Sequence, residues 1–168
     1  DLEKYKVLYM PFHYVENNVW EKIKKWVANG GFVVIEGGYL KDECNRNIDL
    51  GLWIKGFSSQ IETKTQSIGR LPLELPQQKL LDTTQSVSFP VVCLKSTLEI
   101  PDNGTCLLTY KDGSPAAIQV KKGKGNVRIT GFLQGIAYVY DQGKRDMAKW
   151  GDVLLYHSFS PEIRKFVL

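Results

Sequence analysis

The sequence predicts an α/β fold in which a parallel sheet core is followed by an antiparallel β-meander. A strand–helix–strand pattern between Lys6 and Ile35 carries the first half of this prediction, because such a crossover places its two strands parallel in one sheet. The second half comes from three apolar segments between Thr105 and Phe132, which hairpin turn signals separate. Segments punctuated in this way are typical of antiparallel strands joined by tight turns.

In the strand–helix–strand pattern, two short apolar runs flank an amphipathic segment. The runs Lys6–Met10 and Phe32–Ile35 predict buried strands of a parallel sheet. Between them, the large apolar residues of Val19–Ala28 recur on one helical face, and Lys and Glu occupy the other. Asn29-Gly30-Gly31 predicts the end of the helix, because a helix end commonly needs a residue at positive φ.

The remaining elements follow from local composition. Strands are predicted at Ser59–Ile68, Val87–Leu94, Leu98–Ile100, Thr105–Tyr110, Ala116–Val120 and Val127–Phe132. Loops are predicted at Lys41–Asn47 and at Leu71–Leu81, and a short helix or turn at Ile48–Phe57. Asp146–Tyr156 predicts a helix, because its large apolar residues share one face, although Gly151 weakens the pattern.

The composition is that of one globular domain and excludes several classes of protein. The chain has 168 residues, of which 43% are hydrophobic and 24% charged, with a net charge of +4. Nucleic-acid binders concentrate basic residues on one face, whereas the densest basic run here, Lys121–Lys124, is interpreted as a solvated hairpin tip. No apolar run approaches the roughly 20 residues of a membrane span. We therefore expect neither a nucleic-acid nor a membrane partner.

Two stretches, Tyr5–Gly38 and Gly104–Phe132, carry a resemblance to a known family. The first reads as a strand, a helix, a Gly-Gly and a strand, and the second contains Pro115-Ala116 followed by Gly123-Lys124-Gly125. Together they resemble the class I glutamine amidotransferase-like superfamily, and in particular the middle, trimerisation-type domain of bacterial β-galactosidases. Trp150–Pro161 is similar to the closing helix of that domain.

The resemblance implies a fold and a role. The implied fold is a three-layer, flavodoxin-like parallel sheet core with an appended antiparallel β-meander. Residues 1–162 would form this domain without its first βα units, since family domains begin with further units before the strand at Lys6, and residues 163–168 would begin a following segment. The implied role is a non-catalytic structural or interaction domain of a multidomain bacterial carbohydrate-active enzyme.

The implied partners are other domains or subunits of the parent protein. Association into a homo-oligomer and contact with carbohydrate are both expected from the resemblance. The implied compartment is the bacterial cytoplasm or periplasm, and the three cysteines leave the choice between them open.

The catalytic residues of the superfamily are missing from the matching positions. Amidotransferases place a nucleophilic cysteine on a sharp turn after the second strand, where backbone N–H groups can hold an oxyanion. That position falls on or next to Glu36. The late histidine, His157, is followed by Ser158-Phe159-Ser160 and not by an acid. We therefore predict no catalytic residue in this chain.

Five residues near the strand ends form a candidate rim for a ligand or an interface. They are His13, Glu36, Gly37, Gly38 and Tyr39. Open α/β sheets bind ligands at the carboxyl ends of their strands, so a sugar-type binding module at this rim is the alternative function. Glu36 could equally be a solvated or hydrogen-bonded acid that ends its strand. Three cysteines and two histidines match no metal-binding spacing, so neither a metal nor a cofactor is predicted.

Overall fold

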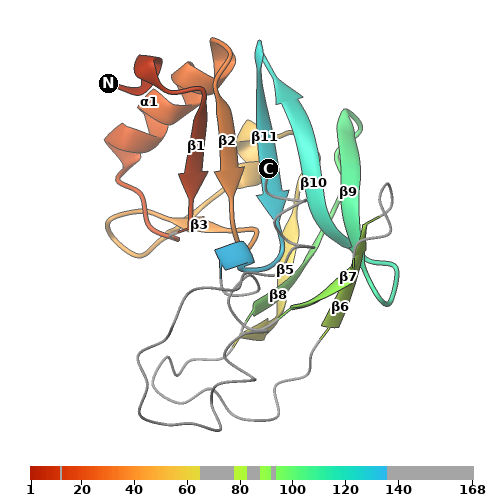
Figure 1. The fold of residues 1–168 in the computed structure, drawn as a ribbon. Coiled ribbons are helices and arrows are strands. Elements are labelled where there is room, and N and C mark those ends of the chain that lie inside the picture. The colour runs from red at the N-terminus through yellow and green to blue at the C-terminus, as the bar shows by residue number, and fades with distance from the viewer. Residues whose placement is uncertain (12, 65–77, 83–87, 92–93, 136–168) are drawn as a thin grey trace, which may run out of the picture.

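A computed structural model describes residues 1–11, 13–64, 78–82, 88–91 and 94–135, which form a mixed α/β fold (Figure 1). Most of the strands belong to one large mixed sheet. In spatial order they are β1 (Val7–Met10), β2 (Phe32–Ile35), β11 (Gly125–Thr130), β10 (Pro115–Lys122), β9 (Gly104–Tyr110), β6 (Gln78–Asp82) and β7 (Ser88–Val91). A short 3₁₀ helix, η1 (Leu2–Lys4), precedes β1.

The predicted βαβ unit is confirmed. Strands β1 and β2 pair in parallel, and α1 (Asn17–Ala28) connects them. The two glycines after this helix have different roles. Gly30 has a φ of 122°, which favours glycine. Gly31 lies against a helix side chain, since a Cβ there would stand 2.3 Å from Cδ2 of Trp26.

The predicted β-meander is also present and is formed by β9, β10 and β11. Strand β11 pairs antiparallel with β10 and parallel with β2, so the meander continues the sheet of the parallel strands. The physical reason lies in β11, where Val127 and Ile129 are fully buried and both edges of the strand are paired.

The main hydrophobic core lies between α1 and one face of the large sheet. Helix α1 contributes Trp20, Ile23, Trp26 and Val27. Alternate residues of the sheet face the same cluster, and they include Met10, Val33, Ile35, Ile118, Val120, Val127 and Ile129. A four-residue helix, α2 (Leu50–Trp53), borders this core, and the Trp53 ring meets the Trp20 ring edge-on with centroids 4.9 Å apart.

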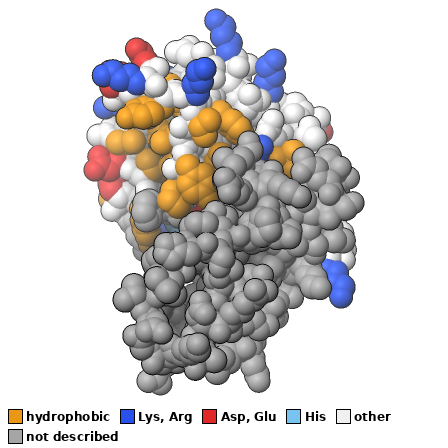
Figure 2. All heavy atoms as spheres, in the orientation of Figure 1, with side chains coloured by type: hydrophobic (Ala, Val, Ile, Leu, Met, Phe, Trp, Pro, Cys, Tyr) orange, Lys and Arg blue, Asp and Glu red, His pale blue; other side chains and the backbone are white. Residues whose placement is uncertain are grey.

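The face of the parallel strands opposite α1 is different. Figure 2 shows hydrophobic side chains gathered on it, over β1 and β2. In the described part of the chain, one helical layer and the large sheet are seen. The predicted helix Asp146–Tyr156 lies outside the described residues, as do Trp150–Pro161 and residues 163–168.

A second, two-stranded sheet lies next to the carboxyl end of β11 (Figure 1). Its strands are β5 (Ser59–Lys64) and β8 (Leu94–Leu98), paired antiparallel. The backbone N–H of Ser96 donates to the carbonyl of Gly131 at 2.7 Å, and the Ser96 hydroxyl donates to the carbonyl of Gly37 at 2.9 Å. These bonds join the small sheet to the ends of β11 and β2.

Several predictions for the middle of the chain are wrong in their boundaries. Gln78–Leu81, predicted as the end of a loop, belongs to β6, because it pairs with β9 and β7. The strand predicted at Leu98–Ile100 is instead β8, which ends at Leu98. The predicted loop at Lys41–Asn47 contributes to a small hairpin. Its strands are β3 (Leu40–Lys41) and β4 (Asn47–Ile48).

Candidate functional site

Glu36 follows the last residue of β2, and its carboxylate is held by the chain itself. The residue is 3% exposed. Its Oε1 accepts a hydrogen bond from the Tyr9 hydroxyl, from the backbone N–H of Gln134 at 2.6 Å and from that of Gly135 at 3.2 Å. One carboxylate oxygen therefore joins β1, β2 and the turn that follows β11.

This arrangement shifts the pKa values of both side chains. Burial raises the pKa of the Glu36 carboxyl, and the hydrogen bonds from Tyr9, Gln134 and Gly135 oppose that rise. Burial also raises the pKa of the Tyr9 hydroxyl, as does its hydrogen bond to Glu36. The Tyr9 hydroxyl is thus a neutral donor to the buried Glu36 carboxyl group, and the backbone N–H groups of Gln134 and Gly135 complete the site.

The two glycines after Glu36 allow a close approach of the small sheet. Gly37 and Gly38 both have a φ of 77°, in the left-handed region that favours glycine. A Cβ on Gly37 would stand 2.6 Å from Cε1 of His13 and 2.7 Å from Cδ2 of Leu94. A Cβ on Gly38 would stand 3.0 Å from Cδ2 of Leu98. Both glycines are buried beneath β8.

His13 and Tyr39 complete the predicted rim. Their rings are stacked, with centroids 4.1 Å apart and an angle of 15° between the planes. Backbone contacts fix this geometry, since the N–H of Lys41 donates to the carbonyl of His13 at 2.6 Å. The five rim residues predicted from the sequence, His13, Glu36, Gly37, Gly38 and Tyr39, therefore lie together at the carboxyl end of β2.

Two of the three hydrogen-bond donors to Glu36 have no local signal in the sequence. Gln134 and Gly135 lie 98 and 99 residues further along the chain. Tyr9 belongs to a strand that was predicted, and in a parallel pair with β2 its side chain had to point to the same face as Val34. That register is the only signal that could have led to Tyr9.

The turn at Glu36 differs from a nucleophile turn in its backbone. A nucleophile turn is sharp and strained, whereas among the described non-glycine residues only Asn45 has a positive φ, at 63°. Within the described ranges, no group of three or more His, Cys, Asp or Glu residues could hold a metal ion. No helix in that part of the chain is long and apolar enough to cross a membrane.

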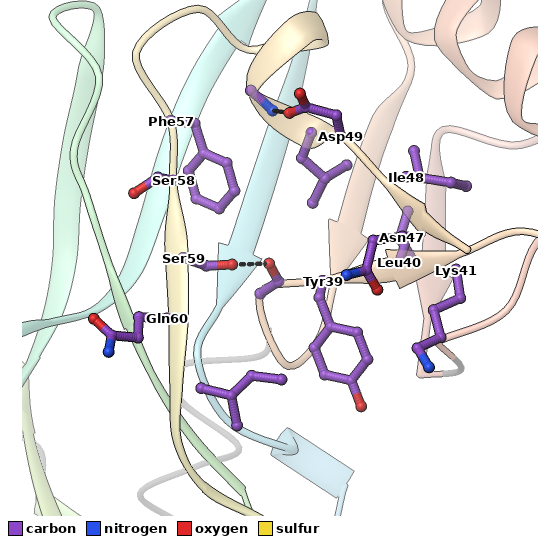
Figure 3. A pocket seen from close by; sticks show the side chains of 14 residues that line it. Tyr39, Leu40, Lys41, Asn47, Ile48, Asp49, Phe57, Ser58, Ser59 and Gln60 are labelled. Atoms are coloured by element: carbon purple, nitrogen blue, oxygen red, sulfur yellow. Dashed lines mark hydrogen bonds between the residues drawn. The ribbon is translucent and has the colours of Figure 1, made fainter. Parts of the chain in front are cut away.

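A second feature, a hollow, lies beside the rim between the β3–β4 hairpin and the start of β5 (Figure 3). Its volume is about 750 Å³. Leu40, Leu50 and Phe57 are buried at its base. Polar side chains line it as well, and they include Tyr39, Asn47, Ser58 and Gln60.

Comparison with known proteins gives matches among solved structures. No family model matches the chain, and no curated protein matches it. The β-galactosidase of Rahnella sp. R3 superposes with a TM-score of 0.62 at 19% identity over 79% of this chain. A GH42 β-galactosidase of G. stearothermophilus superposes with a TM-score of 0.61 at 19% identity over 86%.

The chain has the fold of one part of the GH42 β-galactosidases. It spans only 21% and 22% of the length of the two enzymes above. The same fold also occurs elsewhere, since the N-terminal domain of mmIFT52 matches 90% of this chain with a TM-score of 0.56 at 14% identity. At such identities the β-galactosidase likeness establishes the fold alone, and the function has to be argued from the site.

Proposed function

We propose that this chain is a non-catalytic structural or interaction domain of a multidomain bacterial carbohydrate-active enzyme, a β-galactosidase-like glycoside hydrolase. Its role would be to support domain packing or oligomerisation. The observation that carries the proposal is the state of Glu36. Open α/β sheets bind ligands at this strand end. Here the Oε1 atom of Glu36 already accepts hydrogen bonds from Tyr9, Gln134 and Gly135.

The acidic residues elsewhere in the described chain do not suggest glycosidase chemistry. A glycosidase needs two carboxyl groups flanking the sugar, one of them a general acid with a raised pKa. Glu62 and Asp112 do approach each other, but both bind the ammonium of Lys95, at 2.6 and 2.7 Å. Hydrogen bonds from Lys95 and Ser114 hold the pKa of Asp112 well below its usual range, which is the opposite of what a general acid requires.

The finer architecture belongs to the same proposal. We infer an amidotransferase-like, three-layer core that spans residues 1–162 and has a trimerisation-type role. The parallel βαβ unit and the coverage of about a fifth of each β-galactosidase chain support it. A (β/α)8 barrel needs about 200 residues or more, so glycosidase activity would reside in another part of the parent protein.

Activity and association assays test this proposal. The chain alone is expected to hydrolyse neither glutamine nor nitrophenyl glycosides, and to associate with itself or with the parent protein's other domains in light scattering. Turnover of either substrate by the purified chain would contradict the non-catalytic role. A chain that stays monomeric and binds none of the parent's domains would contradict the interaction role.

A sugar-type binding module is the second candidate, and the hollow beside the rim favours it. Tyr39 is fixed by stacking on His13, and a fixed aromatic ring beside amide and hydroxyl groups suits a sugar, which offers both C–H faces and hydroxyls. In the described chain, no side-chain hydrogen bond occupies the groups of Asn47 or Gln60.

Thermal shift against neutral hexoses tests the second candidate. Galactose and mannose are expected to raise the melting temperature, and Tyr39→Ala is expected to abolish the shift. Tyr5→Ala is the matched control, because Tyr5 is 64% exposed and precedes the opposite end of β1. If neither sugar raises the melting temperature, the hollow is not a sugar site. If a shift survives Glu36→Ala, the sugar binds without the rim carboxylate.

A further inference from the structure

One edge of strand β5 has no partner strand in the described chain. The strand pairs antiparallel with β8, and these two strands form a sheet of their own. Among the described residues, no other strand pairs with the opposite edge of β5. An edge of this kind presents backbone N–H and C=O groups and is a template for another extended chain.

The register shows which backbone groups point outward from this edge. Along an antiparallel strand, residues that exchange hydrogen bonds with the partner alternate with residues whose backbone groups point away from it. The N–H of Glu99 donates to the carbonyl of Ser58 at 2.9 Å, so Ser58 belongs to the first kind. Ser59 and Ile61 belong to the second kind, and their N–H and C=O groups point away from β8.

Ser96 supports this assignment from the other edge of the small sheet. It lies opposite Ile61, and its N–H donates away from β5, to the carbonyl of Gly131 at 2.7 Å. Within the described ranges, the outward N–H and C=O groups of Ser59 and Ile61 make no hydrogen bond. The edge of β5 therefore offers two backbone donors and two backbone acceptors.

The hollow beside the rim runs along this edge. One of its walls consists of the consecutive residues Phe57–Ile61. Because successive side chains point to opposite faces of a sheet, a wall of consecutive residues is the edge of a strand. Figure 3 shows Ser59 on this wall, with its hydroxyl donating to the carbonyl of Gly38 at 2.6 Å. That bond fixes the edge, and the volume of about 750 Å³ is ample for a ligand.

The lining also indicates the chemistry of the occupant. Leu40, Leu50 and Phe57 are buried at the base of the hollow, and this base suits an apolar side chain. The charged residues of the lining are Lys41 and Asp49, and both already make hydrogen bonds within the chain. The charges of the lining also cancel, so the hollow favours an uncharged segment over an acidic or basic one.

We propose that β5 binds an extended, uncharged segment of a partner polypeptide, which adds a strand along the hollow. This rests on the interaction role in the proposed function, and it names the surface that carries that role. The outward groups of Ser59 and Ile61 recur about 7 Å apart along the strand, and an added strand presents its own backbone groups at the same interval. A neutral sugar is the competing occupant.

Selection of a displayed library of random short peptides against the full chain supplies the probes. The selected peptides are expected to bind Ile61→Pro at least about tenfold more weakly than the wild type, because the variant lacks one outward N–H and its ring blocks the added strand. Proline is tolerated on an edge strand, so the pairing with β8 is kept. Ile61→Val is the matched control, because it retains the N–H, and it is expected to bind as the wild type does.

A second measurement leaves the protein unchanged. One copy of a selected peptide is N-methylated at its odd residues, and another copy at its even residues. Because the amides of a strand alternate in direction, one copy is expected to lose binding and the other to keep it. Equal binding of the two copies would overturn the proposal, whatever the stability of the Ile61→Pro protein.

Three further outcomes would count against the β5 edge. The selection yields no peptide, or the selected peptides bind Ile61→Pro as well as Ile61→Val, or galactose raises the melting temperature and displaces the peptides, in which case the hollow is a sugar site. The proposed function is tested separately by light scattering. Association of the chain that persists in Ile61→Pro would leave the interaction role standing and overturn only the assignment of that role to β5.

Discussion

At the residue scale, the carboxylate of Glu36 connects parts of the chain that lie far apart in the sequence. Glu36→Ala would leave the Tyr9 hydroxyl and the N–H groups of Gln134 and Gly135 without their acceptor. A buried donor that loses its partner costs about 1–3 kcal/mol. We therefore expect the free energy of unfolding to fall by about that amount, measured by urea denaturation.

Glu36→Gln tests the hydrogen bonds without a carboxyl group that can carry a charge. Its amide oxygen can still accept from the same donors, so the loss of stability is expected to be smaller than for Glu36→Ala. Glu3→Ala is the control, because Glu3 is an exposed acid in η1. Equal stability of the Glu36→Ala and Glu3→Ala proteins would contradict the connecting role of Glu36.

Gly37 allows a second prediction at this scale. Gly37→Ala combines an unfavourable φ with a Cβ too close to His13 and Leu94. Gly113→Ala is the matched control, because Gly113 has a φ of 86° but nothing within 4 Å of the added Cβ. The left-handed backbone alone costs about 1–2 kcal/mol, so both variants lose stability. Gly37→Ala is expected to lose more, and equal urea midpoints would show that the contact with β8 is not tight.

At the element scale, Lys95 of β8 joins its strand to β5 and to the β9–β10 turn. Its side chain is 7% exposed and binds Glu62 of β5 and Asp112 of the turn. Its ammonium lies over the Tyr110 ring, 4.8 Å from the centroid. A buried ammonium costs stability unless it is paired. The two acids therefore allow a lysine to occupy a buried position. The ion pair between Lys95 and Asp112 also holds the small sheet against the meander.

This network predicts a pH dependence. The pKa of Asp112 is lowered from 3.8 by Lys95 and Ser114. A carboxyl group whose pKa is lower in the folded than in the unfolded protein stabilises the fold. That stabilisation is complete above the pKa of the unfolded protein and is lost as the pH falls through the pKa of the folded protein. The difference in unfolding free energy between wild type and Asp112→Asn should be constant above about pH 5 and shrink below 3.8. Asp102→Asn, at an exposed turn, is the control, and a difference that grows in acid would contradict the network.

Elements fixed by local patterns could be predicted from the sequence, and elements fixed by distant pairing could not. The apolar period of α1 and the bounds of β2 follow from neighbouring residues. Strand β6 is different, because its strand character comes from pairing with β9, some 30 residues away. In the site, the rim positions followed from strand ends, whereas Gln134 and Gly135 reach Glu36 only through the path of the chain after β11.

At the scale of the whole molecule, two sheets meet at the carboxyl ends of the parallel strands. The joint is built from backbone groups of Ser96 and Gly131 and from the carbonyls of Gly37 and Gly38, which accept from Ser96 and Ser59. It occupies the edge where open α/β sheets hold ligands. The rim is therefore partly an internal interface of this chain.

Gly131 provides the sharpest test of this joint. A Cβ on Gly131 would stand 2.0 Å from the carbonyl oxygen of Ser96 and 2.7 Å from the Tyr110 hydroxyl. A backbone oxygen cannot rotate away as a side chain can, so the small sheet must shift. Gly131→Ala is expected to cost about 3 kcal/mol, as overpacking of a core does, and to speed hydrogen exchange in β5 and β8. Gly135→Ala, with nothing within 4 Å of its Cβ, is the control. If Gly131→Ala leaves both the melting temperature and the exchange of β8 unchanged, the two sheets do not meet through this contact.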